Sequence, residues 1–343
     1  MAHAAGGIRL KRGRAVVGLA IVLTWAPAVA VAQQDKAEKS DFSFTLGTRA
    51  WVTTGNTKWN FQGPLFLGGP IIKPLSELRW RGVDSVVPEV NAELVWKRLV
   101  LMGSAGWGGI SEGVLIDDDF ALSDRQGRWS HTRSRVDDNG LFYVNGDVGL
   151  RFFLPPAKNT PPGHIDLVMG YQYWHEKYVA FGATGFQCTA FVGTVQNPIC
   201  AAFGPAVVSA NTKALTHDYF WQSLRVGERA RIPLYAGLSL KANVLLLPWS
   251  SSELRDVHHL RSDLKKNPSF LSRAEGGFGV QLDGGLTYTI WKGLSIEAGY
   301  QYWKLDSGGG DKFTRALSGT TKDNLNEIIV ERYGPYWGLQ YRF

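Results

Sequence analysis

Cysteines and long apolar runs are both scarce in this chain, and each shortage excludes a class of protein. The 343 residues include only two cysteines, Cys188 and Cys200, which form no Cys-x-x-Cys pair, zinc-ligand spacing or haem-attachment motif. After residue 32, no stretch has the run of about 20 apolar residues that a membrane-spanning helix needs. Membrane insertion of the main domain would therefore have to use strands, because a closed barrel satisfies every backbone polar group.

The N-terminus has the features of an exported protein. Four basic residues between positions 9 and 14 precede an apolar stretch at 15–28, and Ala30-Val31-Ala32 supplies the small residues of a cleavage site. Pro27 interrupts this short stretch, which disfavours the alternative of an uncleaved membrane anchor. The sequence therefore predicts a signal peptide at 1–32, an N-terminal periplasmic segment at 33–42 and the main domain at 43–343.

Much of the positive charge belongs to that signal peptide. The chain carries +7, and removal of the four basic residues in the leader leaves a net charge of about +3. A nucleic-acid-binding protein needs a basic face rather than a basic leader. We therefore expect no nucleic-acid partner.

Polar and apolar residues alternate along many segments of the main domain. In 294–302, apolar residues occupy the even positions, whereas Ser295, Glu297 and Gln301 lie on the other face. The segment 144–152 alternates in the same way and places Asp147 and Arg151 on its polar face. A soluble β-sandwich also alternates, but it does not usually bury such charges without partners. The pattern and the abundant glycines and aromatic residues predict an all-β, transmembrane antiparallel up-and-down β-barrel whose last strand ends at the terminal phenylalanine.

Turn signals divide this domain into about ten strands, with an uncertainty of two. Short and long connections alternate, as expected when one rim of a barrel faces the periplasm and the other the cell exterior. The long connections are expected at 62–73, 118–138, 181–214, 256–273 and 307–325. The strands are expected at 43–61, 74–95, 99–117, 139–154, 164–180, 215–234, 238–255, 274–291, 294–306 and 326–343.

Two acidic features stand where strands meet long connections. Asp117 and Asp119 end the third strand, and Asp256 and His258 follow the seventh. Residues two apart on a strand share a face, so each pair can point into the lumen. A carboxylate beside an imidazole is the unit of general-base catalysis, and a second carboxylate pair could hold a water. By themselves these residues fit a solvated or cation-binding rim better than a catalytic site.

The order of these features resembles the omptin family, ten-stranded outer-membrane endopeptidases of Gram-negative bacteria. Asp117-x-Asp119 followed by Phe120 is similar to the family's Asp-x-Asp-Trp, and Trp249 precedes Asp256-x-His258 as in its Asp-x-His segment. Looser similarities lie along nearly the whole main domain, at 43–48, 76–80, 103–107, 170–172 and 338–343. The resemblance implies that Asp256 and His258 polarise a water, and that Asp117 and Asp119 complete the catalytic site across a groove at the outer mouth. Asp118 lies where the family varies and is left out of this set.

The residues aligned with the family's substrate pockets differ in chemistry. Omptins favour cleavage between basic residues because acidic side chains line these pockets, whereas the aligned residues here are Trp59, His131 and Leu254. Without a carboxylate, a pocket holds an Arg or Lys side chain poorly. We therefore expect a peptide or protein substrate without dibasic specificity.

Lipopolysaccharide is a further partner that the resemblance implies. Tyr171 matches the start of the family's lipopolysaccharide motif, and Lys177 and Arg225 are candidate contacts nearby. An ordinary aromatic girdle explains Tyr171 at least as well. We expect no metal and no cofactor, with lipopolysaccharide as a possible activator.

The two cysteines fall inside the long connection 181–214. In an oxidising compartment they can pair and close a loop of eleven intervening residues. Such a disulfide would stiffen an exposed flap that either shapes access to the groove or resists external proteases.

Three classes of function remain open from the sequence. They are a surface endopeptidase with its mouth facing the cell exterior, a non-enzymatic barrel that binds lipopolysaccharide or another surface partner, and a small-solute pore. The pore is disfavoured because ten strands leave little lumen beyond the side chains.

Overall fold

The computed structural model describes residues 42–137, 140–156 and 160–343. The predicted signal peptide and positions 33–41 of the predicted periplasmic segment lie outside these residues. The described residues form twelve strands: β1 (Phe42–Pro64), β2 (Ile71–Trp96), β3 (Leu99–Leu122), β4 (Gln126–Val136), β5 (Gly140–Phe153), β6 (His164–Thr194), β7 (Asn197–Tyr235), β8 (Leu238–His258), β9 (Phe270–Trp291), β10 (Leu294–Asp306), β11 (Gly310–Ala316) and β12 (Gly319–Arg342). None of the described residues belongs to a helix that is long and apolar enough to cross a membrane.

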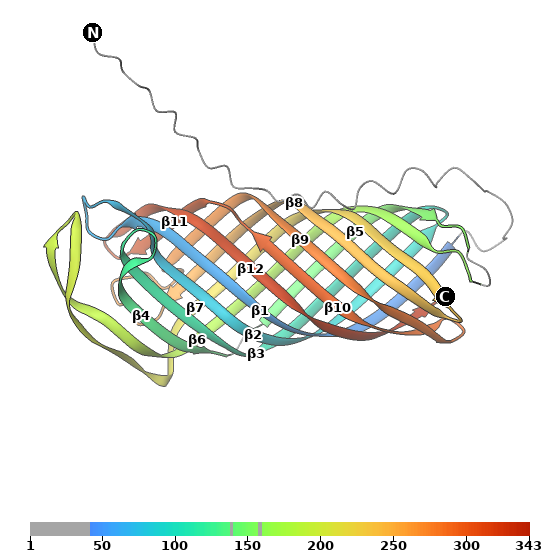
Figure 1. Cartoon of the computed structure of the whole chain (residues 1–343), viewed down its shortest axis with the longest axis horizontal. Helices are drawn as coiled ribbons and strands as arrows, with labels where there is room; N and C mark the ends of the chain where they lie inside the picture. The colour runs from blue at the N-terminus through green and yellow to red at the C-terminus, as the bar shows by residue number, and fades with distance from the viewer. Residues whose placement is uncertain (1–41, 138–139, 157–159) are drawn as a thin grey trace, which may run out of the picture. The chain divides into compact units, whose positions relative to one another are not determined.

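The strands close into one antiparallel barrel with ten strand positions (Figure 1). Strands β4 and β5 share the place between β3 and β6, and β10 and β11 share the place between β9 and β12. Pairing of β12 with β1 closes the ring. The predicted ten-stranded transmembrane barrel is therefore confirmed.

The final residue takes part in the closure of the ring. The Phe343 backbone N–H donates to the carbonyl oxygen of Phe44 at 2.9 Å, and the two rings lie 5.7 Å apart. The last strand thus remains paired with β1 up to the chain terminus.

The short connections lie where the sequence predicts them. Strands β2 and β3, β7 and β8, and β9 and β10 are each joined by two residues. Gly237 and Gly293 have φ angles of 87° and 76°, a left-handed conformation that glycine adopts without steric cost and that tight hairpins need. These turns define the short-connection end of the barrel.

Three of the segments predicted as long connections are mostly β-strand in the structure, so their prediction as connections was wrong. The connection 118–138 contains β4, 181–214 contains the outer parts of β6 and β7, and 307–325 contains β11 and the start of β12. Outside a membrane both faces of a ribbon can contact water, so the alternation that marks the spanning strands is lost there. The barrel wall therefore continues well beyond its apolar part at this long-connection end.

Apolar side chains form an exposed belt around the part of the barrel nearer the short connections. Charged residues of the same strands point inward, which is the arrangement expected of a strand that faces lipid on one side. The belt includes Leu101, Trp107, Val144, Val148, Leu167, Met169, Leu224, Val226, Leu240, Leu282, Leu286, Ile296, Tyr300, Trp337 and Leu339.

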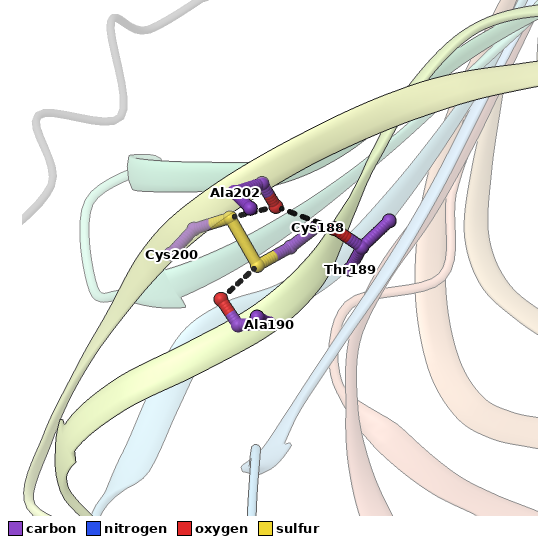
Figure 2. Close-up of a disulfide and its surroundings, with 5 residues drawn as sticks. All are labelled: Cys188, Thr189, Ala190, Cys200 and Ala202. Atoms are coloured by element: carbon purple, nitrogen blue, oxygen red, sulfur yellow. Dashed lines mark hydrogen bonds between the residues drawn. A yellow bond between two sulfur atoms is a disulfide. The ribbon is translucent and has the colours of Figure 1, made fainter.

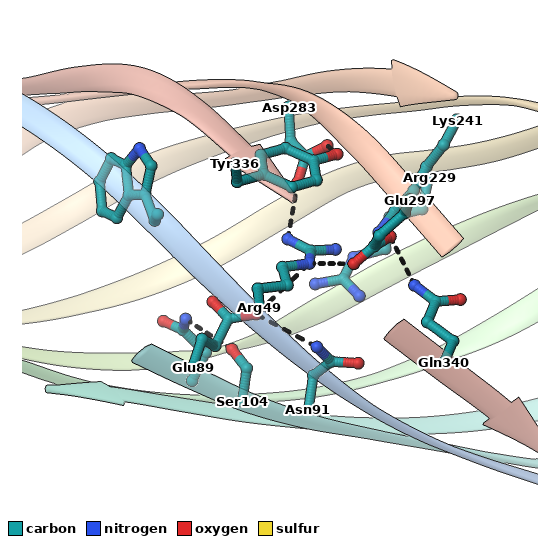
Figure 3. Close-up of polar contacts among 12 residues, drawn as sticks. Arg49, Glu89, Asn91, Ser104, Arg229, Lys241, Asp283, Glu297, Tyr336 and Gln340 are labelled. Atoms are coloured by element: carbon teal, nitrogen blue, oxygen red, sulfur yellow. Dashed lines mark hydrogen bonds and ion pairs between the residues drawn. The ribbon is translucent and has the colours of Figure 1, made fainter. Parts of the chain in front are cut away.

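Ion pairs fill the lumen inside the belt. Arg49 donates from Nε to Glu297 at 2.5 Å and from Nη1 to Asp283 at 3.1 Å, and Lys241 lies 3.3 Å from Glu297 (Figure 3). Two cavities of about 110 and 70 Å³ border this network. Because a water molecule occupies about 30 Å³ of liquid, each cavity has room for only a few waters.

An aromatic layer lies between this network and the long-connection end. The Trp303 ring packs 5.1 Å from Trp51, 4.8 Å from Tyr143 and 5.3 Å from Trp174. All four side chains are buried and belong to strands from different parts of the ring. The lumen is therefore closed in its middle by side chains.

Candidate functional site

Strands β3 and β8 bring the predicted catalytic residues to the inner wall beyond the aromatic layer. Asp117 and Asp119 share the inward face of β3 with buried Leu115, while Asp256 shares the inward face of β8 with buried Leu254. These positions lie beyond the last residues of the apolar belt on each strand. The site thus sits in the part of the barrel that projects past the membrane-facing wall.

Asp256 and His258 form a hydrogen-bonded pair. The His258 Nε2 atom lies 3.0 Å from Asp256 Oδ2, and the His258 backbone N–H donates to Ser269 Oγ at 3.0 Å. The ring of Phe270 meets the His258 ring edge to face at 4.7 Å. These three contacts hold His258 in place, and its side chain remains 19% exposed.

The charge of Asp256 is stabilised by two imidazole rings. Burial opposes ionisation of this carboxyl, but His217 and His258 outweigh burial and hold its pKa well below the usual value. Asp256 is fully buried. It is therefore an anion at neutral pH, as the orienting partner of a histidine base must be.

The facing carboxyls are shifted in the opposite direction. Burial, followed by the charges of Asp119 and Asp256, raises the pKa of Asp117 well above its usual value. Burial also raises the pKa of Asp119 to about 6, although Ser76, His258 and Ser130 act against it. Asp117 therefore holds its proton more tightly than an ordinary carboxyl, while Asp119 exchanges its proton at about pH 6.

The two pairs lie close enough to act on each other electrostatically. Asp256 is among the charges acting on Asp117, and His258 is among those acting on Asp119. Two carboxyls with raised pKa values and a histidine–aspartate pair can together hold a water and accept its proton. No group of three or more His, Cys, Asp or Glu side chains suited to a metal ion occurs in the described part of the chain.

Comparison with known proteins identifies the architecture. No family model matches the sequence, and no curated protein matches it. The crystal structure of the outer membrane protease OmpT from Escherichia coli is similar over 89% of this chain and 99% of that one, with a TM-score of 0.68 and 14% sequence identity. The chain has the omptin fold. That identity is too low to carry an activity from one protein to the other.

Two further solved barrels are much less similar to this chain than OmpT is. The toluene transporter TbuX of Ralstonia pickettii aligns with 86% of this chain and 90% of its own, at 13% identity and a TM-score of 0.26. The monoaromatic hydrocarbon channel CymD aligns with 89% of each chain, at 10% identity and a TM-score of 0.23.

His217 is part of the site, although sequence analysis did not single it out. It lies on β7 opposite Asp256, and its Nε2 atom is 3.1 Å from Asp256 Oδ2. The side chain is fully buried. Only the register between β7 and β8 brings these residues together, and no local sequence pattern reports that register.

The expected pocket residues do not form an open pocket. Trp59 and Leu254 are fully buried in the inner wall, and the Trp59 indole donates to Ser272 Oγ at 3.1 Å. Apolar burial on the inner face explains both positions. Neither side chain presents a surface to a substrate in this structure.

The expected role of His131 in a pocket needs correction. Its Nδ1 atom lies 2.7 Å from Asp118 Oδ1, and Asp118 points away from the face shared by Asp117 and Asp119. The register pairs Ser130 with Asp119, and a shift of one residue moves a side chain to the other face of the wall. Ser130 therefore takes the inward place that the alignment gave to His131.

The expected lipopolysaccharide contacts fall on both sides of the wall. The exposed side chain of Tyr171 points outward and donates to Gln222 at 2.5 Å, and Lys177 lies on the same face of β6. Arg225 instead points into the lumen, where it is buried 3.5 Å from Asp147. The assignment of Arg225 to an outer lipid contact was wrong, because the register gives the outward place to Leu224.

The two cysteines form a disulfide that joins β6 and β7 beyond the site (Figure 2). Thr189 beside it donates to the carbonyl oxygen of Ala202 at 3.1 Å. Near the tip, Phe191 packs against Phe66 and Trp129 at 5.4 and 5.7 Å. The cross-linked hairpin therefore contacts both the β1–β2 connection and β4 of the neighbouring wall.

Proposed function

We propose that this chain is an omptin-like endopeptidase that hydrolyses peptide bonds with an activated water. The observation that carries the proposal is the bonded pair Asp256–His258 facing Asp117 and Asp119 beyond the closed part of the lumen. The omptin fold supports it, since OmpT has this fold and is a protease. His258 would take a proton from water, and Asp256 would stabilise the imidazolium that forms.

The facing acids supply complementary chemistry. Burial raises the pKa of Asp117, which favours its protonated form, and in that form it can donate a hydrogen bond to the carbonyl oxygen as negative charge develops there. Asp119 can hold the water while ionised. The different pKa values of the two carboxyls thus suit one to donate a hydrogen bond and the other to bind the water.

The surroundings favour substrates without basic side chains. Lys312 on β11 is buried between the rings of Phe61 and Phe270, with Nζ 3.5 and 4.5 Å from their centroids. It also acts electrostatically with Asp119 and Asp256. The Lys312 ammonium is already paired with Asp323 at 3.1 Å, and Trp59 and Leu254 supply no carboxylate at the positions expected to hold an Arg or Lys side chain.

We propose that the mouth with the long connections faces the cell exterior. The omptin fold and the apolar belt support a place in the outer membrane, and barrels of this kind usually carry their longer connections outside. Lipopolysaccharide is a proposed partner and activator, with Tyr171 and Lys177 as its contacts on the outer wall.

A peptide-library cleavage assay in detergent with added lipopolysaccharide tests the activity. We expect the wild type to cleave and His258→Ala to lose at least about 10²-fold in kcat/KM, because a general base contributes that much or more. Equal cleavage by both proteins, or none by either, would contradict the proposal. In the second case a non-enzymatic barrel that binds a surface partner would explain the fold.

A further inference from the structure

His217 makes two polar contacts from within the inner wall. Its Nε2 atom is 3.1 Å from Asp256 Oδ2, and its Nδ1 atom is 2.8 Å from the hydroxyl of Tyr219. The ring packs 5.0 Å from Trp80 and 6.1 Å edge-on to Trp59. Since the side chain is fully buried, His217 cannot contact a substrate directly.

The proton positions follow from the partners of the two nitrogens. Burial and nearby Asp256 raise the pKa of Tyr219 well above its usual value, so this phenol keeps its proton. When its O–H donates to Nδ1 of His217, the ring proton of that histidine lies on Nε2, on the side of Asp256. The carboxylate oxygen Oδ2 then faces the imidazole N–H of His217 at 3.1 Å, an ionic contact that lacks hydrogen-bond geometry, and is hydrogen-bonded to Nε2 of His258 at 3.0 Å.

The other oxygen of Asp256 has no hydrogen-bond partner among the described residues. Without His217, only His258 would hold this carboxylate, which could then rotate about its terminal torsion. A rotated carboxylate would release His258 from the bond at Nε2. That bond matters because it keeps the proton on Nε2 and leaves Nδ1 as the nitrogen that can accept a proton from water.

We propose that His217 is a positioning residue of the peptidase site, which fixes Asp256 so that Asp256 holds His258 in the tautomer able to accept a proton at Nδ1. The effect on catalysis rests on the proposed function, whereas the positioning of His258 rests on the His217–Asp256–His258 geometry alone. In the reaction, water gives a proton to Nδ1 while its oxygen bonds to the peptide carbon and the C=O π electrons move to the carbonyl oxygen. When the carbonyl re-forms and the C–N bond breaks, Nδ1 gives that proton to the leaving amine, and the proton on Nε2 stays in place throughout. His217 gains and loses no proton.

Two amide variants separate the contacts of His217. In His217→Gln the side-chain amide can reach the place of Nε2 and still donate to Asp256, whereas in His217→Asn it reaches only the place of Nδ1 and Tyr219. We expect His217→Gln to keep kcat within about threefold of the wild type. We expect His217→Asn to lose about tenfold or more in kcat with little change in KM, since misplacement by 1 Å can cost about 10²-fold.

A matched control comes from His175 on β6. Its Nε2 atom lies 2.5 Å from Asp218 Oδ1, so it forms another histidine–aspartate pair, on the outward face of the wall. His175→Asn should leave kcat and KM unchanged. Heat-modifiable migration on gels checks that each variant is a folded barrel.

Nitrogen-15 NMR of histidine-labelled protein tests the positioning directly and does not require activity. We expect His258 to be protonated on Nε2 in the wild type and in His217→Gln, and to show a mixture of tautomers in His217→Asn. Equal kcat and the same His258 tautomer in both variants would overturn the inference and leave the peptidase proposal intact. If the wild type cleaves nothing, the proposed function fails, and the NMR comparison alone still decides whether His217 positions His258.

Discussion

At the scale of single residues, adjacent carboxyls in β3 have opposite electrostatic environments. Asp119 points inward, where burial raises its pKa to about 6. Asp118 points outward, where His131, Arg128 and Arg79 outweigh the effect of burial and lower its pKa. Side-chain alternation on one strand thus separates a carboxyl suited to proton exchange from one that stabilises the wall.

The raised pKa of Asp119 predicts that ionisation of this carboxyl lowers the free energy of unfolding of the barrel. A carboxyl with a raised folded pKa binds its proton more tightly when folded, so stability falls as pH rises from about 3.8 to about 6. Asp119→Asn should therefore raise Tm at pH 8 through a gain on the order of 3 kcal/mol. The gain should vanish at pH 4, and cleavage should be lost. Thermal unfolding in detergent at both pH values measures this.

Asp118→Asn is the matched control for that measurement. Its lowered pKa means that the ionised form stabilises the folded barrel at every pH above the usual carboxyl range, so the substitution should lower Tm at pH 8. Changes of the same sign in both variants would contradict the assignment of the two faces.

At the scale of elements, the β6–β7 hairpin is the part that depends on a covalent cross-link. Cys188 and Cys200 join its two strands beyond the last residues that pair with β4 and β8. A disulfide that closes a loop of this length contributes about 3 kcal/mol, mainly by restricting the unfolded chain. The stabilisation should act on the hairpin and leave the closed barrel unaffected.

Replacement of both cysteines by serine tests this separation. We expect limited proteolysis to cut the segment 189–199 about tenfold faster or more, because each 1.4 kcal/mol changes an opening equilibrium tenfold. The Tm of the barrel should stay the same, and wild-type protein treated with a reductant should behave like the double variant. Equal cutting rates in all three samples would show that the disulfide does not stabilise the hairpin.

At the scale of the whole molecule, the barrel has a lumen closed by side chains in its middle and a wall that extends beyond the apolar belt at the long-connection end. The aromatic layer around Trp303 separates the ion pairs near Arg49 from the candidate site. On the side of that layer nearer the short connections, the cavities of about 110 and 70 Å³ have room for only a few waters. The packed rings therefore disfavour passage of solutes through the middle of the barrel.

Electrical recording tests the closed lumen. Inserted into planar lipid bilayers, the wild type should show no steady conductance steps, because packed rings leave no continuous water path. The double variant Trp303→Ala/Trp51→Ala, which lacks two of the packed rings, should conduct ions more readily than the wild type. Regular conductance steps from the wild type would contradict a closed barrel and revive the pore hypothesis.

The sequence by itself determined the barrel and the placement of two residue pairs. Period-two alternation and a terminal aromatic strand are local signals, so the strand count, the short turns and the inward direction of Glu297 and Arg151 were predictable. The pairs Asp117–Asp119 and Asp256–His258 were predictable as well, because residues two apart on a strand share a face.

Only the tertiary structure decided what surrounds these pairs. The contact of His217 with Asp256, the outward pairing of His131 with Asp118 and the burial of Arg225 beside Asp147 all depend on strand register. Register is set by interactions between strands, and a slip of one residue reverses every side chain. A single sequence carries the period of each strand, whereas the neighbours of each side chain follow only from the closed ring.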